Sequence, residues 1–142
     1  MNPSRLLCVA LAACASAALC VHAELVVIVN PKNPVTALSA HQVAQIYLGR
    51  TGSFPGGGRA TPIDLSEGAA LRDEFYLKVS ERNPGQVRAY WSKQLFSGNG
   101  TPPREVATTA EMKRAVAADP TAIGYVERSA LDGSVKEILA VR

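Results

Sequence analysis

The segment from Asp64 to Arg72 holds the residues whose types and spacing best fit binding chemistry. It follows a short apolar stretch and reads Asp-Leu-Ser-Glu-Gly-Ala-Ala-Leu-Arg, a pattern typical of a strand that leads into a helix. The first turn of a helix leaves backbone N–H groups without partners, and its dipole favours negative charge. Small side chains there let an oxyanion approach, and an arginine one turn further in could add a bidentate contact. The sequence therefore predicts an anion site formed by Ser66, Gly68, Ala69, Ala70 and Arg72.

The same segment also fits a purely structural role. Ser66 could cap the helix through its hydroxyl, and Glu67 could complement the dipole. The Glu67 carboxylate would also repel an anion at close range. The helix start is therefore either open to a ligand or closed by its own side chains.

Other kinds of chemistry find little support in the sequence. His41 stands early in a predicted helix, where an exposed structural role is expected. No serine lies in a Gly-x-Ser-x-Gly context, and the glycines 56–58 lack the lysine and Ser/Thr of a phosphate-binding loop, so they predict a flexible loop. Tyr90, Trp91 and Phe96 recur at near-helical spacing and predict core positions. We expect no catalytic activity, no metal and no cofactor.

Residues 1–23 have the pattern of a secretory signal peptide. Arg5 gives a positive start, residues 6–20 are apolar and small, and the segment ends in small-x-small at Ala23. The apolar run is shorter than the roughly 20 residues needed to cross a membrane as a helix, and no other segment is a better candidate. We therefore expect export with no membrane span, and the alternative is a lipoprotein cleaved before Cys14.

The remaining chain, residues 24–142, has the size and composition of one domain. The sequence of 142 residues is 47% hydrophobic, which suits a single modest core. All three cysteines lie before residue 24, so this domain has none for a disulfide, a thiolate or a zinc site. It keeps 14 Lys and Arg against 12 Asp and Glu, or +2, and the basic residues are scattered, which argues against nucleic-acid binding.

Strands and helices are expected to alternate along residues 24–142. Residues 24–29 are a continuous β-branched run, typical of an interior strand. Further strands are expected at 61–65, 123–126 and 135–141. Four helices are expected, with caps at Ser39, Ser66, Asn83 and Thr108. The order β-α-β-α-α-α-β-β predicts a two-layer or three-layer α/β sandwich with a mixed sheet.

The apolar spacing in these helices predicts which side chains face the core. In the helix after Asn83 they are Val87, Tyr90, Trp91 and Leu95. In the last helix they are Met112, Ala115, Val116 and Ala117.

Three short sequence motifs, taken together, resemble those of the periplasmic phosphate-binding proteins of ABC uptake systems. They are Gln-Ile-Tyr-Leu-Gly at 45–49, Ser-Glu-Gly at 66–68 with Phe75, and Thr-Ala-Ile-Gly-Tyr-Val-Glu at 121–127. The resemblance runs along most of residues 24–130 and implies a type II periplasmic-binding-protein-like fold, a mixed sheet flanked by helices. Members of that family grip ligand between two lobes, whereas residues 24–142 number 119 and match a single lobe.

The ligand motif departs from the family pattern. Members that hold phosphate carry Arg-Ser-Asp-Gly-Ser-Gly-Thr, and the matching positions here run from Leu65 to Leu71. The arginine and both later hydroxyl donors are absent, which leaves backbone N–H groups and Arg72. Losing a charge-assisted contact costs about 1.5–3 kcal/mol and each neutral one about 0.5–1.5 kcal/mol, so affinity should fall by roughly a hundredfold or more.

The resemblance implies an exported, periplasmic binding domain that takes phosphate or another small oxyanion weakly. Its expected partner would be an ABC permease or another envelope protein. The alternative is an envelope interaction or scaffold protein that keeps the fold without a ligand. A homodimer would favour this alternative over a solitary binder, because two copies could rebuild a two-lobed cleft.

Overall fold

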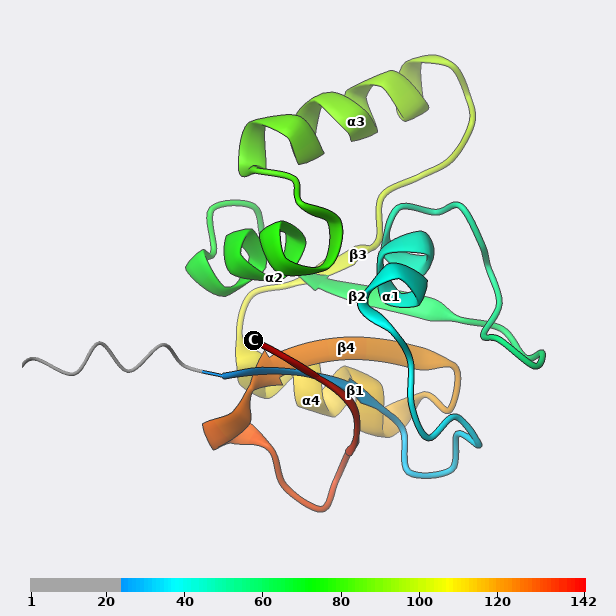
Figure 1. Cartoon of the computed structure of the whole chain (residues 1–142), viewed down its shortest axis with the longest axis vertical. Coiled ribbons are helices and arrows are strands. Elements are labelled where there is room, and N and C mark those ends of the chain that lie inside the picture. The colour runs from blue at the N-terminus through cyan, green and yellow to red at the C-terminus, as the bar shows by residue number, and fades with distance from the viewer. Residues whose placement is uncertain (1–23) are drawn as a thin grey trace, which may run out of the picture.

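The computed structural model describes residues 24–142, which form a mixed five-stranded sheet with helices on both faces (Figure 1). The predicted signal peptide and the alternative lipidation site at Cys14 lie outside these residues. The elements in chain order are β1 (Leu25–Val29), α1 (Ala40–Tyr47), β2 (Thr61–Leu65), α2 (Ala70–Ser80), α3 (Pro84–Phe96), β3 (Arg104–Val106), α4 (Thr109–Ala118), β4 (Ala122–Glu127), the 3-10 helix η1 (Arg128–Ala130) and β5 (Lys136–Val141).

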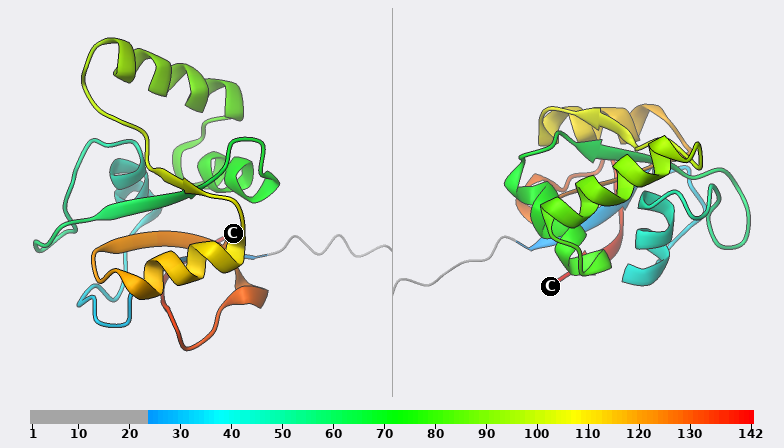
Figure 2. Two further views of the ribbon diagram at one scale, coloured as in Figure 1. Left: turned by 180° about the vertical axis from the view of Figure 1, so that it is seen from behind. Right: turned by 90° about the horizontal axis from the view of Figure 1, so that it is seen from above.

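The strand order across the sheet is β3-β2-β4-β1-β5. β2 is parallel to β3 and β4, while β1 is antiparallel to β4 and β5, so the predicted mixed sheet is confirmed. All residues of β1 are buried, which confirms its interior position. Seen from above, α4 covers one face of the sheet, and α1 and α2 cover the other (Figure 2).

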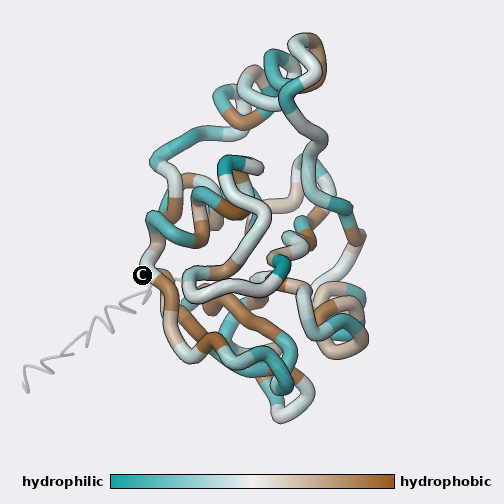
Figure 3. Tube along the Cα trace, turned by 90° about the vertical axis from the view of Figure 1, so that its right-hand side faces the viewer, coloured by the Kyte–Doolittle hydropathy of each residue, from teal (hydrophilic) through white to brown (hydrophobic). Residues whose placement is uncertain are grey.

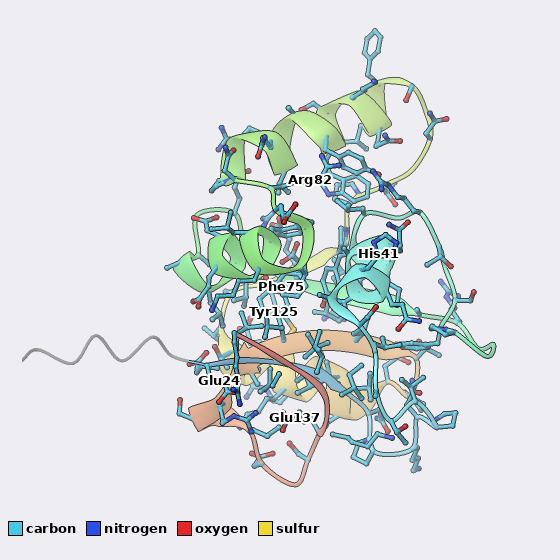
Figure 4. All side chains as sticks on the ribbon, in the orientation of Figure 1. Glu24, His41, Phe75, Arg82, Tyr125 and Glu137 are labelled. Atoms are coloured by element: carbon cyan, nitrogen blue, oxygen red, sulfur yellow. The ribbon has the colours of Figure 1, made fainter. Side chains whose placement is uncertain are left out.

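Aromatic side chains fill the space between the sheet and the α1–α2 layer. Phe75 of α2 stacks on Tyr125 of β4 with ring centroids 4.0 Å apart, and Figure 4 shows the two side by side. The Tyr47 hydroxyl donates hydrogen bonds to the carbonyls of Ile63 (2.8 Å) and Ile123 (3.1 Å), so α1 is tied to two neighbouring strands. Figure 3 shows the most hydrophobic segments gathered in the sheet, with hydrophilic segments in the loops around it.

Three of the four predicted helix caps are confirmed, at Ser39, Asn83 and Thr108. The fourth is wrong, because the N-cap of α2 is Ala69, which has no side-chain cap bond. Gly68 adopts a left-handed φ of +94°, which an α-helix excludes, so α2 starts later than predicted. Ser66 is then too early to cap, and its hydroxyl donates to the carbonyl of Val106 (3.3 Å).

The last turn of α3 does not reach the core. α3 packs through Val87 and Trp91, but Phe96 is 98% exposed and Leu95 is more than half exposed, so the predicted core positions for these two residues are wrong. Figure 1 shows α3 set apart from the sheet, beyond α2. Its C-terminal end therefore extends past the elements that could cover it.

Three further differences concern short segments. β3 was not predicted, because a three-residue strand carries no periodic signal of its own. Ala117 is exposed, since α4 buries Met112 and Val116 on a narrower face. The loop around glycines 56–58 is closed by a bridge between Ser53 and Arg59 and by backbone hydrogen bonds.

Candidate functional site

The start of α2 leaves several backbone donors unused. No hydrogen bond within residues 24–142 uses the N–H groups of Gly68, Ala70, Leu71 or Arg72. A Cβ at Gly68 would meet no atom within 4 Å, so the space beside this residue is open. α2 therefore begins without a side-chain cap, and its first-turn N–H groups have no acceptor within residues 24–142.

The neighbouring Glu67 does not cover these N–H groups. Its exposed carboxylate accepts a hydrogen bond from Nε of Arg88 on α3, at 2.5 Å. Ser66 is also turned away, because its N–H and its hydroxyl both donate to the carbonyl of Val106 on β3. The expected cap by the Ser66 hydroxyl is therefore wrong, and the Glu67 carboxylate makes no hydrogen bond to these N–H groups.

Arg72 is bonded within the chain. Its Nη1 donates to Oε1 of Glu105 (2.9 Å) and to the carbonyl of Leu65 (3.3 Å). Its Nε lies 3.6 Å from Oδ2 of Asp64, and its guanidinium stands over the ring of Tyr76. The side chain is 11% exposed, so Arg72 is held firmly and already has a carboxylate partner.

Beneath Arg72 lies a buried carboxylate that sequence reasoning missed. Asp64 is 1% exposed and accepts hydrogen bonds from the hydroxyls of Tyr76 (2.6 Å) and Tyr125 and from the N–H of Leu65 (2.9 Å). Burial raises the pKa of the Asp64 carboxyl, and the bonds from Tyr125 and Tyr76 and the charge of Arg72 oppose that rise. An aspartate between two apolar strand residues was the available signal, since such a position needs hydrogen-bond partners.

A hollow of about 160 Å³ lies beside the start of α2, between α2, α3 and residues 102–105. Of the residues predicted for the site, only Arg72 lines it, and Ser66, Gly68, Ala69 and Ala70 lie outside it. The charged residues that line the hollow are Glu67, Arg72, Asp73, Arg88 and Glu105. Each arginine is paired with one glutamate, so the hollow is not a simple basic pocket.

The described residues offer little for a histidine site, a metal site or a membrane span. His41 is exposed on α1, as expected (Figure 4). Within residues 24–142, no group of three or more His, Cys, Asp or Glu is arranged to hold a metal ion. In the same part of the chain, none of the helices is long and apolar enough to cross a membrane.

The fold is similar to solved phosphate-transport proteins. A protein from Clostridium perfringens, described as a phosphate ABC transporter substrate-binding protein with bound phosphate, matches with a TM-score of 0.66 at 22% identity. An ABC-type phosphate transport receptor from Vibrio cholerae matches with 0.63 at 21%, and PstS from Borrelia burgdorferi with 0.55 at 14%. Neither a family model nor a curated protein matches the sequence.

These matches cover 81% of this chain but only 44%, 45% and 46% of the three proteins. The chain thus spans less than half their length. The predicted α/β fold, one lobe of a phosphate-binding-protein-like architecture with a mixed sheet, is confirmed.

Proposed function

We propose that this chain is an exported binding domain that takes phosphate or another small oxyanion weakly at the start of α2. The uncapped first turn carries the proposal, because its N–H groups have no acceptor within residues 24–142 and Gly68 leaves space in front of them. Such N–H groups and the helix dipole together favour an anion. No catalytic role is proposed.

Weak binding follows from the side chains that the site lacks. The side chains of Leu65, Ala69 and Leu71 offer no hydrogen-bond donor where the phosphate-binding motif has arginine, serine and threonine. Arg72 already donates to the Glu105 carboxylate through its Nη1. Backbone N–H groups then supply most of the attraction, at about 0.5–1.5 kcal/mol for each hydrogen bond.

The likeness to a phosphate ABC transporter substrate-binding protein and to an ABC-type phosphate transport receptor supports an ABC permease as partner and, with it, a place in the cell envelope. Residues 24–142 match one lobe, and a two-lobed cleft needs a second wall beside it. A second copy of this chain is our proposal for that wall. Light scattering of the purified protein, with and without phosphate, tests it, and a monomer under both conditions contradicts it.

Ala69→Asp tests the binding site itself. An aspartate at this N-cap position would bond the first-turn N–H groups, so α2 should gain about 0.5–2 kcal/mol of stability while the anion loses its donors. The measurement is an amide NMR titration with phosphate and with sulfate, followed at Gly68, Ala70 and Leu71. Ala89→Asp, at an exposed position within α3, is the control that adds the same charge elsewhere.

Shifts in the wild type and in Ala89→Asp that vanish in Ala69→Asp support the proposal. Equal shifts in all three proteins contradict it.

A scaffold role is the second candidate, favoured by the pairing of both arginines in the hollow with glutamates. It predicts no amide shift with either anion in any of the proteins.

A further inference from the structure

A second hollow, of about 360 Å³, lies between α1, the turn that follows it and the C-terminal end of α2. It shares no lining residue with the hollow beside the start of α2. The charged and titratable side chains that line it are His41, Arg50, Lys78, Glu81 and Arg82. Figure 4 shows His41 on α1 and Arg82 in the connection between α2 and α3. Without counting His41, three cationic side chains therefore line this hollow against one carboxylate.

The two arginines of this hollow, Arg50 and Arg82, have no counter-charge. Within residues 24–142, no carboxylate lies within ion-pair distance of either guanidinium. The Lys78 ammonium, by contrast, already pairs with Glu74 at 2.6 Å. Both arginines of the hollow beside the start of α2 are also paired, each with a glutamate. Two unpaired guanidiniums that line one hollow make it electropositive, which favours an anionic ligand.

One aromatic ring orients both of these arginines. The guanidinium carbon of Arg82 lies 5.0 Å from the centre of the Tyr90 ring, and that of Arg50 lies 5.9 Å from it. The ring itself is held in place, because the Tyr90 hydroxyl donates to the carbonyl of Leu48 at 2.6 Å. A contact with an aromatic face orients a guanidinium but uses none of its N–H donors. Both arginines are thus oriented before a ligand arrives, and less side-chain freedom is lost on binding.

We propose that this hollow is a second binding site, which takes a phosphoryl group on Arg50 and Arg82. A phosphoryl group carries about two negative charges and three acceptor oxygens, so it can serve both guanidiniums at once. A monocarboxylate offers one charge and one pair of oxygens, which suffice for one guanidinium only. The first turn of α1 contributes no free donors at its cap, because Ser39 and Gln42 close it as a capping box. The site therefore depends on side chains and is independent of the proposed function at the start of α2.

Arg50→Gln and Arg82→Gln test the site, because each removes one guanidinium and keeps a polar side chain. We expect each variant to bind phenyl phosphate about tenfold more weakly than the wild type, since one charge-assisted contact is lost. Arg114→Gln is the matched control, because Arg114 is exposed on α4, which covers the other face of the sheet (Figure 2). Its affinity for phenyl phosphate should stay within about twofold of the wild type, since a distant surface charge is screened.

Amide NMR titrations at constant ionic strength measure both the affinity and the place of binding. The probes are phenyl phosphate, inorganic phosphate and benzoate, which keeps the ring but carries a single carboxylate. Phenyl phosphate should shift the N–H resonances of residues 41, 45 and 80–82, and benzoate should bind more weakly. Tighter binding of phenyl phosphate than of inorganic phosphate assigns the site to a phosphate ester, equal binding assigns it to the free anion, and both outcomes support the inference.

Two results overturn the inference. One is equal affinity for phenyl phosphate in the wild type, Arg50→Gln, Arg82→Gln and Arg114→Gln. The other is the absence of any shift at residues 41, 45 and 80–82 with either phosphate. Shifts confined to residues 68–71 overturn the inference and leave the proposed function intact, whereas shifts confined to residues 41, 45 and 80–82 do the reverse.

Discussion

Replacing Asp64 by asparagine should destabilise the domain strongly, because its carboxylate joins β2, β4 and α2. It accepts bonds from Tyr76, Tyr125 and the N–H of Leu65, and it lies beside Arg72. An asparagine side chain has one acceptor oxygen and a donor NH₂ group, so at least one tyrosine hydroxyl loses its acceptor. Arg72 also loses its buried counter-charge.

The magnitude follows from these losses. A hydrogen bond to a charged group contributes about 1.5–3 kcal/mol, and a buried polar group left without a partner costs about 1–3 kcal/mol. Breaking a buried ionic contact by removing one partner typically costs about 3–5 kcal/mol. Because Arg72 keeps Glu105, we expect the lower end, a loss of about 3 kcal/mol in the free energy of unfolding at pH 7.

The contribution of Asp64 to the free energy of unfolding should depend on pH. Burial raises the pKa of the Asp64 carboxyl in the folded protein above its ordinary value of 3.8. Between the unfolded and the folded pKa, the folded protein therefore keeps a proton that the unfolded chain has released. Stability from this group therefore falls as pH rises through this range. Asparagine does not titrate, so the difference between wild type and Asp64→Asn should be largest at the acid end and shrink towards neutral pH.

Urea unfolding between pH 4 and 8 measures both quantities. Asp73→Asn serves as the control, since Asp73 lies in the first turn of the same helix and makes no ion pair within the described residues. Its loss should cost less than about 1 kcal/mol. A loss below about 1 kcal/mol for Asp64→Asn, or a difference that grows with pH, would refute the reasoning.

Two further predictions concern packing and capping. In Gly124→Ala, the new Cβ would lie 2.7 Å from Met112 and 2.8 Å from Val116, so overpacking should lower the free energy of unfolding by about 1–3 kcal/mol. Gly133→Ala is the control: its Cβ would meet no atom within 4 Å, and it should change the free energy of unfolding by less than about 0.5 kcal/mol. Equal effects in urea unfolding would contradict the packing argument. Ser39→Ala removes the capping box of α1 and should cost about 1 kcal/mol, and unchanged thermal unfolding would contradict that assignment.

Much of the fold could be predicted because its signals are local. The β-branched run at 25–29 and the caps at Ser39, Asn83 and Thr108 depend on residues within a few positions of each other. β3 could not be predicted, since it exists only through pairing with β2. The exposure of Phe96 was missed for a related reason: helical spacing shows which side chains share a face, but not how far the neighbouring elements extend.

The candidate site could be predicted only in part. Small residues at a strand-to-helix junction indicated the open N–H groups, but the start of α2 was placed too early because the left-handed Gly68 was not recognised as a break. The partner of Arg72 could not be found, because Glu105 is 33 residues away and reaches it through the register of β2 and β3. Long-range pairing of this kind leaves no pattern in the sequence.

The charges around the proposed site favour weak over tight binding of an anion. Glu67 is paired with Arg88, whereas Arg72 is shared by Glu105 and the buried Asp64. Besides the helix dipole, the uncompensated charges near the first turn are therefore Asp73 and one carboxylate of the Arg72 cluster. The dipole attracts an anion by about 0.3–1 kcal/mol at an exposed helix start, and Asp73 repels it. Short-range hydrogen bonds from the free N–H groups must then supply the rest. Binding should accordingly weaken with added salt, since the dipole term is screened, but should not be abolished by it.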